Sequence, residues 1–325
     1  MVNSLRRVLV TGASGFIGSA LCRRLIASGV QVHGVSRNPP ASADAQHWWR
    51  SIAGDISHEA PVSEIQWWNA DLVQLEAARS LIRAIRPDAT FHLASLVTGS
   101  RSLETVLPIF RNNLMTALNL LTSTAENDAG RMVLGGSFEE PDEVDSAPCS
   151  PYAAAKWSAS GYARMFHALY QTPMVIAKIF MVYGPGQTDH TKLVPYVTMS
   201  LLRREAPRLS SGGRLVDWIY VDDVVDGLIG CAQTPGIDGR TVELGSGELR
   251  SIREIVEKLG DLVPCRVDPL FGALPDRPLE RSKTADTAGS YELIGWRPST
   301  SIGAGLTRTI EWYKRKLNSS VNESI

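Results

Sequence analysis

The stretch Val8-Leu-Val-Thr-Gly-Ala-Ser-Gly-Phe-Ile-Gly18 decides the fold, because it reads as a strand, a glycine turn and the start of a helix. Residues 8–10 form the short apolar run of a buried parallel strand, and three glycines follow it at intervals of three. Behind the turn, apolar residues recur at helical spacing until Gly29, which is placed to end the helix.

The three glycines stand where a turn must be tight, where the backbone must approach a pyrophosphate closely, and where the helix must pack against the strand. The N-terminus of the helix offers free N–H groups and the positive end of its dipole to phosphates. We therefore predict a dinucleotide-binding turn; a glycine turn that joins strand to helix without a ligand is the alternative. The predicted cofactor-binding residues of this turn are Gly12, Ser14, Gly15, Phe16, Ile17 and Gly18.

Composition narrows the class of protein. The chain has 325 residues, enough for two lobes at ~100–200 residues per domain, and carries 33 basic against 34 acidic residues. Nucleic acid and membrane surfaces are therefore poor candidates as partners. With no apolar targeting segment and no run of about 18 apolar residues, we expect a cytoplasmic protein. Because the four cysteines are scattered, we expect neither disulfides nor a metal site.

The strand predicted over residues 30–35 ends where a fold of this kind selects its cofactor. An acidic residue about twenty positions after the glycines would bind the ribose 2′-hydroxyl of NAD, but this chain has Ser36 and Arg37. A hydroxyl and a guanidinium suit a 2′-phosphate, so NADP(H) is favoured over NAD(H); an exposed surface arginine is the alternative for Arg37. Residues 38–64 then predict a loop with a short helix.

Later strand ends supply further cofactor candidates. A strand over residues 65–68 leads to Asp71, whose carboxylate we expect at the adenine amino group. A strand over 90–95 ends in small residues, which let a dinucleotide lie across the sheet; His92 within it is expected to be a hydrogen-bonded core histidine. A long helix is predicted over 108–125, with a candidate cofactor or water ligand near its start. These candidates are Asp71, Leu72, Leu93, Ala94, Ser95 and Asn113.

A tyrosine and a lysine supply the candidate catalytic chemistry. Ser150-Pro-Tyr-Ala-Ala-Ala-Lys156 opens a helix, so Tyr152 and Lys156 share one helical face. An ammonium beside a phenol is expected to lower the phenol pKa from about 10. Tyr152 then transfers a proton at a sugar or alcohol oxygen that Ser137 also hydrogen-bonds, and Lys156 also holds the nicotinamide ribose. An ordinary surface pair is the alternative.

Together these motifs resemble the extended short-chain dehydrogenase/reductase family, in its NAD(P)-dependent nucleotide-sugar epimerase, dehydratase and reductase branch. The likeness runs along nearly the whole chain, from Thr11–Gly18 through Phe180-Met-Val-Tyr-Gly-Pro-Gly-Gln187 to Asp217–Asp223 and Gly295–Pro298. The resemblance implies a catalytic set of Ser137, Tyr152 and Lys156, and a dinucleotide held by Gly12, Gly15, Gly18 and Asp71.

The resemblance also implies a nucleotide-diphosphate sugar as the substrate. Arg277 matches the place where the family grips the diphosphate, and guanidinium chemistry suits that role. Lys192 is a further substrate candidate, with a solvated lysine as the alternative. Val216 stands where relatives often carry an arginine, and Arg214 is the candidate replacement.

Glu139 remains at a position where the family's dehydratases carry an acidic pair, but Phe138 replaces the other acid. A 4,6-dehydratase needs both a carboxyl acid and a base to expel water from the sugar. Dehydration is therefore disfavoured. Glu139 is a candidate active-site base, with a solvated glutamate in a turn as the alternative.

Three functions are weighed. The leading hypothesis is an NADPH-dependent reductase of a nucleotide-linked keto-deoxysugar, with Tyr152 as the general acid. The alternative is an NAD(P)-dependent nucleotide-sugar 4-epimerase that holds its cofactor tightly. A non-catalytic dinucleotide-binding scaffold would be expected to lack Tyr152 or Lys156, and this chain has both.

The order of segments predicts an α/β fold, a doubly wound parallel Rossmann sheet with a smaller C-terminal α+β substrate lobe. We expect residues 1–178 with 213–234 to form the NAD(P)-binding domain, and 179–212 with 235–325 to form the nucleotide-sugar lobe. By family likeness, the apolar helix faces after Pro108 and Tyr152 pair in a homodimer through a four-helix bundle. Burial of those faces within one chain is the alternative.

Overall fold

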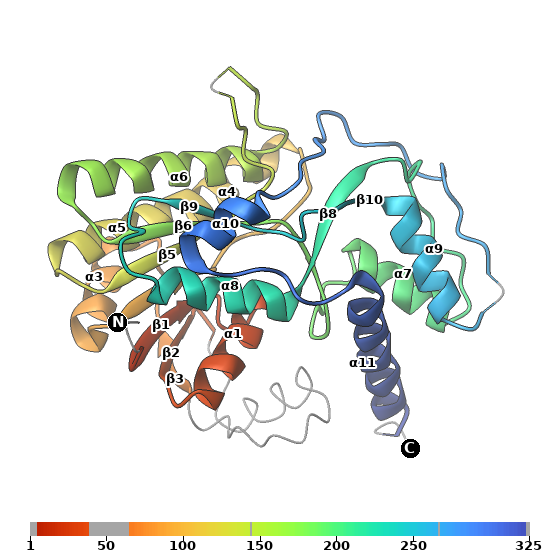
Figure 1. Cartoon of the computed structure of the whole chain (residues 1–325), viewed down its shortest axis with the longest axis horizontal. Helices are drawn as coiled ribbons and strands as arrows, with labels where there is room; N and C mark the ends of the chain where they lie inside the picture. The colour runs from red at the N-terminus through yellow and green to blue at the C-terminus, as the bar shows by residue number, and fades with distance from the viewer. Residues whose placement is uncertain (1–4, 39–64, 144, 266, 323–325) are drawn as a thin grey trace.

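The computed structural model describes residues 5–38, 65–143, 145–265 and 267–322, in which helices cover both faces of a seven-stranded sheet (Figure 1). The loop predicted over 38–64 lies, apart from Asn38, outside these residues. The strands of the sheet are β1 (Arg7–Thr11), β2 (Gln31–Ser36), β3 (Ile65–Asn69), β4 (Ala89–His92), β5 (Arg131–Ser137), β6 (Met174–Ile179) and β9 (Thr241–Leu244).

All seven strands run parallel in the order β3-β2-β1-β4-β5-β6-β9. The sequence of connections reverses between β1 and β4, and ligands of such sheets bind at the carboxyl ends of the strands on either side of that point. The predicted Rossmann sheet is therefore confirmed. It places the glycine turn after β1 at the edge where a dinucleotide binds.

Helices form a layer on each face of the sheet, and each layer has its own apolar core. On one face, α1 (Phe16–Ala27) packs beside α8 (Val221–Gln233), and Gly29 follows α1 with a positive φ of 76°. The other face carries a row of longer helices, the middle one packed against both of its neighbours. These are α3 (Leu75–Ile85), α5 (Thr116–Glu126) and α6 (Pro151–Tyr170).

A smaller sheet lies beside the large one, at the end of the molecule that contains the C-terminus in Figure 1. Its strand β8 (Leu215–Tyr220) pairs parallel with β7 (Met181–Tyr183) and antiparallel with β10 (Leu249–Ser251). The helices of this part are α7 (Leu193–Leu202), α9 (Ile252–Leu262) and α11 (Ile302–Asn322).

Strand pairing differs from the expected division of the chain in two places. β8 lies within 213–234, which was expected in the cofactor domain, but it belongs to the small sheet. β9 lies within 235–325, which was expected in the sugar lobe, but it extends the large sheet and is covered by α10 (Thr287–Ile294). By pairing with β6, β9 satisfies backbone groups that would otherwise form an exposed sheet edge.

The fourth strand is shorter than predicted. β4 ends at His92: the N–H of Leu93 still donates to the backbone carbonyl of Thr11, but that of Ala94 donates to the Thr11 hydroxyl instead, at 3.2 Å each. His92 is the predicted core histidine: it is 1% exposed, and its Nδ1 lies 2.7 Å from Thr11 Oγ1. Burial lowers its pKa to about 3, so the ring is neutral.

The helix predicted over 108–125 is interrupted. After the short turns η2 (Leu103–Thr105) and α4 (Val106–Ile109), residues Phe110–Met115 form a π-helical segment, η3, before α5 begins. Such bulges occur mostly as single turns within α-helices, often at functional sites. This one contains Asn113, whose amide binds the backbone of Leu96 through both polar atoms, at 2.7 and 3.1 Å.

Two buried aspartates join the C-terminal segments to β8 and α8. Asp217 accepts hydrogen bonds from the backbone N–H groups of Ser246, Gly247 and Ala285. Asp223 accepts from residues 299 and 300 in the same way. The segment 217–223, which stood out in the sequence, therefore has a structural role: its two aspartates fix the backbone of later segments of the chain.

The three glycines of the turn leave no room for side chains. Gly12 has a φ of +72°, and a Cβ there would lie 2.7 Å from the backbone nitrogen of Ala94. A Cβ on Gly18 would overlap the carbonyl oxygen of Gly12, and one on Gly15 would lie 3.2 Å from the same oxygen. The turn, the helix and β4 therefore meet backbone to backbone.

We expect Gly18→Ala to lower the free energy of unfolding by roughly 3 kcal/mol or more, because the clash is with backbone that cannot rotate away. Gly260→Ala in α9 is the matched control: an added Cβ meets nothing within 4 Å, and helix propensity should raise stability by up to about 1 kcal/mol. Urea unfolding of both variants measures this. Equal stability of Gly18→Ala and the parent would contradict the contact.

Candidate functional site

The glycine turn is shaped to receive an anionic dinucleotide. Ser14 and Gly15 are exposed, and the first turn of α1 has neither an acidic residue nor a side-chain cap, so its backbone N–H groups face outward without competition. Nearby, the buried hydroxyl of Ser95 has no hydrogen-bond partner among the described residues. Backbone donors, an open loop and an unpaired hydroxyl fit a nicotinamide dinucleotide, which supplies the hydride chemistry when bound.

The other cofactor candidates occupy the same carboxyl edge. Ser36 ends β2, and Arg37, which follows it, is exposed. Asp71 is exposed after β3, its carboxylate accepting from the N–H of Val73 at 3.2 Å, whereas Leu72 is buried. Both polar atoms of the Asn113 amide are hydrogen-bonded to the loop after β4, so this side chain positions the backbone of that loop.

Ser137, Tyr152 and Lys156 come together where β5 ends and α6 begins. Ser150 caps α6 by accepting from the N–H of Ala153 at 3.1 Å, which sets the phase of the helix. The side chain of Ser137 interacts with the phenol of Tyr152 and acts to lower its pKa. The ammonium of Lys156 lies 5.8 Å from the centre of the Tyr152 ring and donates to the carbonyl of β5 Gly135 at 2.7 Å.

The prediction that the pKa of the Tyr152 phenol is lowered is wrong. Burial raises the pKa of Tyr152 well above its usual value, and the charges of Glu139 and Glu140 add to the rise. Burial also lowers the pKa of Lys156 to about 8, against which Glu140 acts. Ser137 opposes the rise in the pKa of Tyr152, but desolvation outweighs it, so Tyr152 is protonated at neutral pH and is equipped as a proton donor.

Two of the three substrate candidates, Arg214 and Lys192, act electrostatically on Glu139, which follows the candidate catalytic Ser137 by two residues. Burial and Glu280 raise the pKa of the Glu139 carboxyl, whereas Arg214, Arg101 and Lys192 oppose the rise. Phe138, at the other expected acid position, is buried and stacks on Phe180, with the Arg214 guanidinium 5.8 Å from the Phe138 ring centre.

Arg214 and Val216 have different surroundings, and the replacement of an arginine at position 216 by Arg214 stays a prediction. Val216, in β8, is buried in the apolar core, whereas the guanidinium of Arg214 lies 2.9 Å from the carboxylate of Glu280. The Nε of Arg214 is buried without a hydrogen-bond partner among the described residues. Arg277, 60% exposed, lies 4.0 Å from the same glutamate and packs on Gly99. Two guanidiniums on one carboxylate form an anion-binding arrangement.

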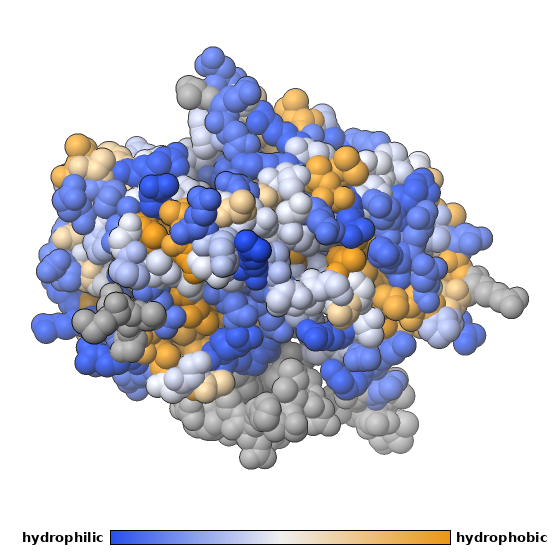
Figure 2. All heavy atoms as spheres, in the orientation of Figure 1, coloured by the Kyte–Doolittle hydropathy of each residue, from blue (hydrophilic) through white to orange (hydrophobic). Residues whose placement is uncertain are grey.

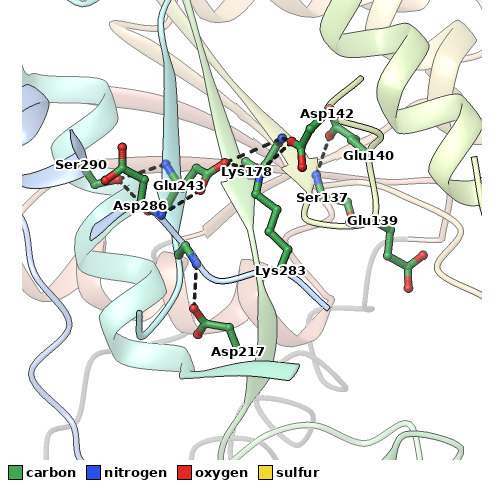
Figure 3. Close-up of polar contacts among 11 residues, drawn as sticks. Ser137, Glu139, Glu140, Asp142, Lys178, Asp217, Glu243, Lys283, Asp286 and Ser290 are labelled. Carbon is green, nitrogen blue, oxygen red and sulfur yellow. Dashed lines mark hydrogen bonds and ion pairs between the residues drawn. The ribbon is translucent and has the colours of Figure 1, made fainter. Parts of the chain in front are cut away.

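A partly buried charge network lies behind this site (Figure 3). Lys178 on β6 and Lys283 each contact the carboxylates of Asp142 and Glu243, at distances from 2.6 to 3.8 Å. Glu140 accepts from the N–H of Ser137 at 2.6 Å. The network ties the loop after β5 to the segment that carries Arg277.

Sequence reasoning missed three charged residues of the site. Glu139 was predicted as a site residue but Glu140 was not, although the Glu-Glu pair shortly after a predicted strand can be seen in the sequence. Glu280 follows Arg277 by three residues, which is a recognisable ion-pair spacing. Arg101 carried no sequence signal: its guanidinium reaches the carbonyls of Cys149 and Pro278 only through the tertiary fold.

The described residues contain no group of three or more His, Cys, Asp or Glu side chains arranged to bind a metal. Within the same residues, no helix has the length and apolar character needed to cross a membrane.

A parallel sheet with a dinucleotide turn and a Ser-Tyr-Lys set defines a class of nicotinamide-dependent enzymes. The sequence profile of the NAD dependent epimerase/dehydratase family matches residues 8–245. The chain belongs to this family, which confirms the resemblance seen in the sequence, and it is an enzyme.

Its relatives span the chemistry of the family. A UDP-glucose 4-epimerase of Mycolicibacterium smegmatis is 29% identical, covering 95% of this chain and 99% of that protein. A probable dTDP-glucose 4,6-dehydratase of Sinorhizobium fredii is 28% identical, covering 94% and 92%. The structure of UDP-glucuronic acid 4-epimerase from Bacillus cereus, in complex with UDP-glucuronic acid and NAD, is similar with a TM-score of 0.81 and 25% identity, covering 95% and 99%.

Proposed function

We propose that this enzyme transfers a hydride between a nicotinamide dinucleotide and C4 of a nucleoside-diphosphate sugar. The observation that supports this most is that the buried Tyr152 phenol interacts with Ser137, the last residue of β5, while the ammonium of Lys156 lies 5.8 Å from the centre of the Tyr152 ring. Tyr152 donates its proton to the ketone oxygen, Ser137 orients that oxygen, and Lys156 stabilises the phenolate that remains. The names of the relatives support C4 as the reacting carbon.

Tyr152→Phe should lower kcat by roughly 10²–10⁴-fold, because it removes the transferable proton but keeps the ring. Dinucleotide affinity, measured by fluorescence titration, should stay nearly unchanged. Tyr291→Phe, which removes a hydroxyl from an exposed tyrosine of α10, is the matched control and should retain parental turnover. Full activity of Tyr152→Phe would rule out the mechanism.

The finer proposal is an NADPH-dependent reductase of a nucleotide-linked keto-deoxysugar. Ser36 and Arg37 at the end of β2 support it, since a hydroxyl and an exposed guanidinium suit a ribose 2′-phosphate and no carboxylate stands there to repel it. A protonated Tyr152 supports the reductive direction. Because Phe138 disfavours dehydration, we assign Glu139 to the wall of the sugar pocket and not to a dehydration step.

NADPH should be consumed one for one with the keto-sugar, and Arg37→Ala should raise the KM for NADPH by about 10-fold while leaving that for NADH nearly unchanged, because only NADPH carries the 2′-phosphate. Arg6→Ala is the control: this arginine is exposed and pairs with Asp88 at the opposite edge of the sheet. Absorbance at 340 nm measures both quantities.

Two results would contradict the reductase. A clear preference for NADH would remove the role of Arg37. A sugar that isomerises without net change of the cofactor would instead establish the second candidate, a 4-epimerase with a tightly held cofactor. The epimerase is favoured by two of the relatives above, which are named as 4-epimerases.

We further propose a homodimer. Leu114 and Leu121, expected on the pairing face, are buried within one chain, but the turns before them expose Leu103 (85%) and Leu107 (66%). On the face drawn in Figure 2, apolar residues gather in small patches among polar ones. The end of α6 adds the exposed Leu169.

Light scattering should give a mass twice the 35.4 kDa of one chain. Leu107→Asp should shift the mass toward that of a monomer, because it places a charge in a desolvated interface. Leu274→Asp, also at an exposed leucine but in the C-terminal part, should not. A monomeric parent would end this proposal and leave the catalytic one standing.

A further inference from the structure

The last residues of β5 have no strand partner on one side. β4 ends opposite Leu134, so the residues of β5 that follow it are paired only with β6. Phe138 donates its N–H to a carbonyl of β6 at 3.1 Å, and successive residues of a strand direct their N–H groups to opposite sides. The N–H of Ser137 and the carbonyl of Gly135 therefore point away from β6, to the side that β4 leaves open.

Two charged side chains bind the backbone groups on that open side. Lys156 donates to the carbonyl of Gly135 at 2.7 Å, and the carboxylate of Glu140 accepts from the N–H of Ser137 at 2.6 Å (Figure 3). The N–H of Glu140 in turn donates to the carbonyl of Ser137 at 3.1 Å. Glu140 is only 4% exposed, and a buried N–H without an acceptor is costly. One residue thus satisfies both backbone groups of the serine.

The glycine next to Ser137 leaves room for this carboxylate. A Cβ on Gly136 would lie 2.8 Å from Oε1 of Glu140, closer than such atoms approach without a bond. The carboxylate therefore lies against the strand at the glycine and reaches the N–H of the following residue.

The hydroxyl of Ser137 is held separately from its backbone. Its Oγ accepts from the N–H of Glu139 at 3.2 Å. A hydroxyl has one proton to donate and two lone pairs that accept, so the proton of Ser137 is still free to be directed at the reacting oxygen. Where that proton points depends on the main chain of Ser137, which Glu140 fixes.

We propose that Glu140 is a positioning residue of the reaction: its carboxylate fixes the main chain of Ser137, so that the serine hydroxyl keeps its place beside Tyr152. The inference rests on the proposed function and adds a residue to it. Glu140 acts on the substrate only through Ser137, because its printed contacts are with backbone. A reacting group displaced by about 1 Å can cost 10²-fold in rate, so the loss of this single acceptor should be visible in turnover.

Glu140→Leu, which removes the acceptor at similar size, should lower kcat by about 10²-fold and change the KM for the sugar nucleotide and the dinucleotide affinity by less than about 3-fold. Glu140→Gln keeps an acceptor oxygen at the same reach, so it should keep kcat within about 3-fold of the parent. The assays combine NADPH with the 4-keto-6-deoxyhexoses of UDP, dTDP, GDP and CDP at 340 nm. UDP-glucose with NAD⁺, followed by product analysis, covers epimerisation.

Glu143→Leu and Glu143→Gln are the matched controls, because Glu143 is an exposed carboxylate of the same loop, and both should keep parental kcat. Parental kcat in a folded Glu140→Leu variant, or an equal loss in Glu140→Gln, would overturn the inference and leave the proposed function standing.

If Glu140→Leu does not fold, as judged by circular dichroism, Gly136→Ala decides the question. Its added Cβ displaces the carboxylate from the strand while Glu140 itself is kept. A lowered kcat then supports the inference, and an unchanged kcat in the folded variant overturns it. If the parent enzyme converts none of the sugar nucleotides, the proposed function and this inference fail together.

Discussion

The backbone contact between Gly12, Gly18 and Ala94 is the constraint on which the rest of the structure depends. Because no side chain separates them, α1 rests on the end of β1, and the end of β4 rests on the same turn. This contact opens the carboxyl edge of the sheet at the one point where the strand order reverses. The exposed loop residues and the N–H groups of α1 then face that edge together.

Burial governs the electrostatics of the reacting groups. A lysine and a tyrosine one helical turn apart suggest an acidic phenol when read as an isolated pair. In the folded chain, desolvation raises the pKa of Tyr152 and lowers that of Lys156, and the carboxylate of Glu140 acts on both. The outcome is a neutral phenol beside an ammonium, which is the protonation state needed to deliver a proton.

The small sheet is attached to the large one by polar contacts from buried acids. Asp217 and Asp223 bind backbone N–H groups of the C-terminal segments, and Lys283 connects Asp142 to Glu243 across the sheet edge. Charges buried in this way are costly unless each one has partners. The buried acids Asp217 and Asp223 both have such partners, and the ion pairs of Lys283 connect the loop after β5 to the segment that follows Glu280.

Local patterns in the sequence determined the Rossmann sheet, the glycine turn and the Ser-Tyr-Lys set, because strand runs, helical spacing and tight turns are properties of neighbouring residues. They did not determine that β9 joins the large sheet, that a π-helical turn interrupts the helix near Asn113, or that Glu280 pairs with Arg214. Those features depend on residues distant in the chain. The pKa of Tyr152 was likewise decided by tertiary structure, since burial, which no spacing reveals, is the largest cause of its rise.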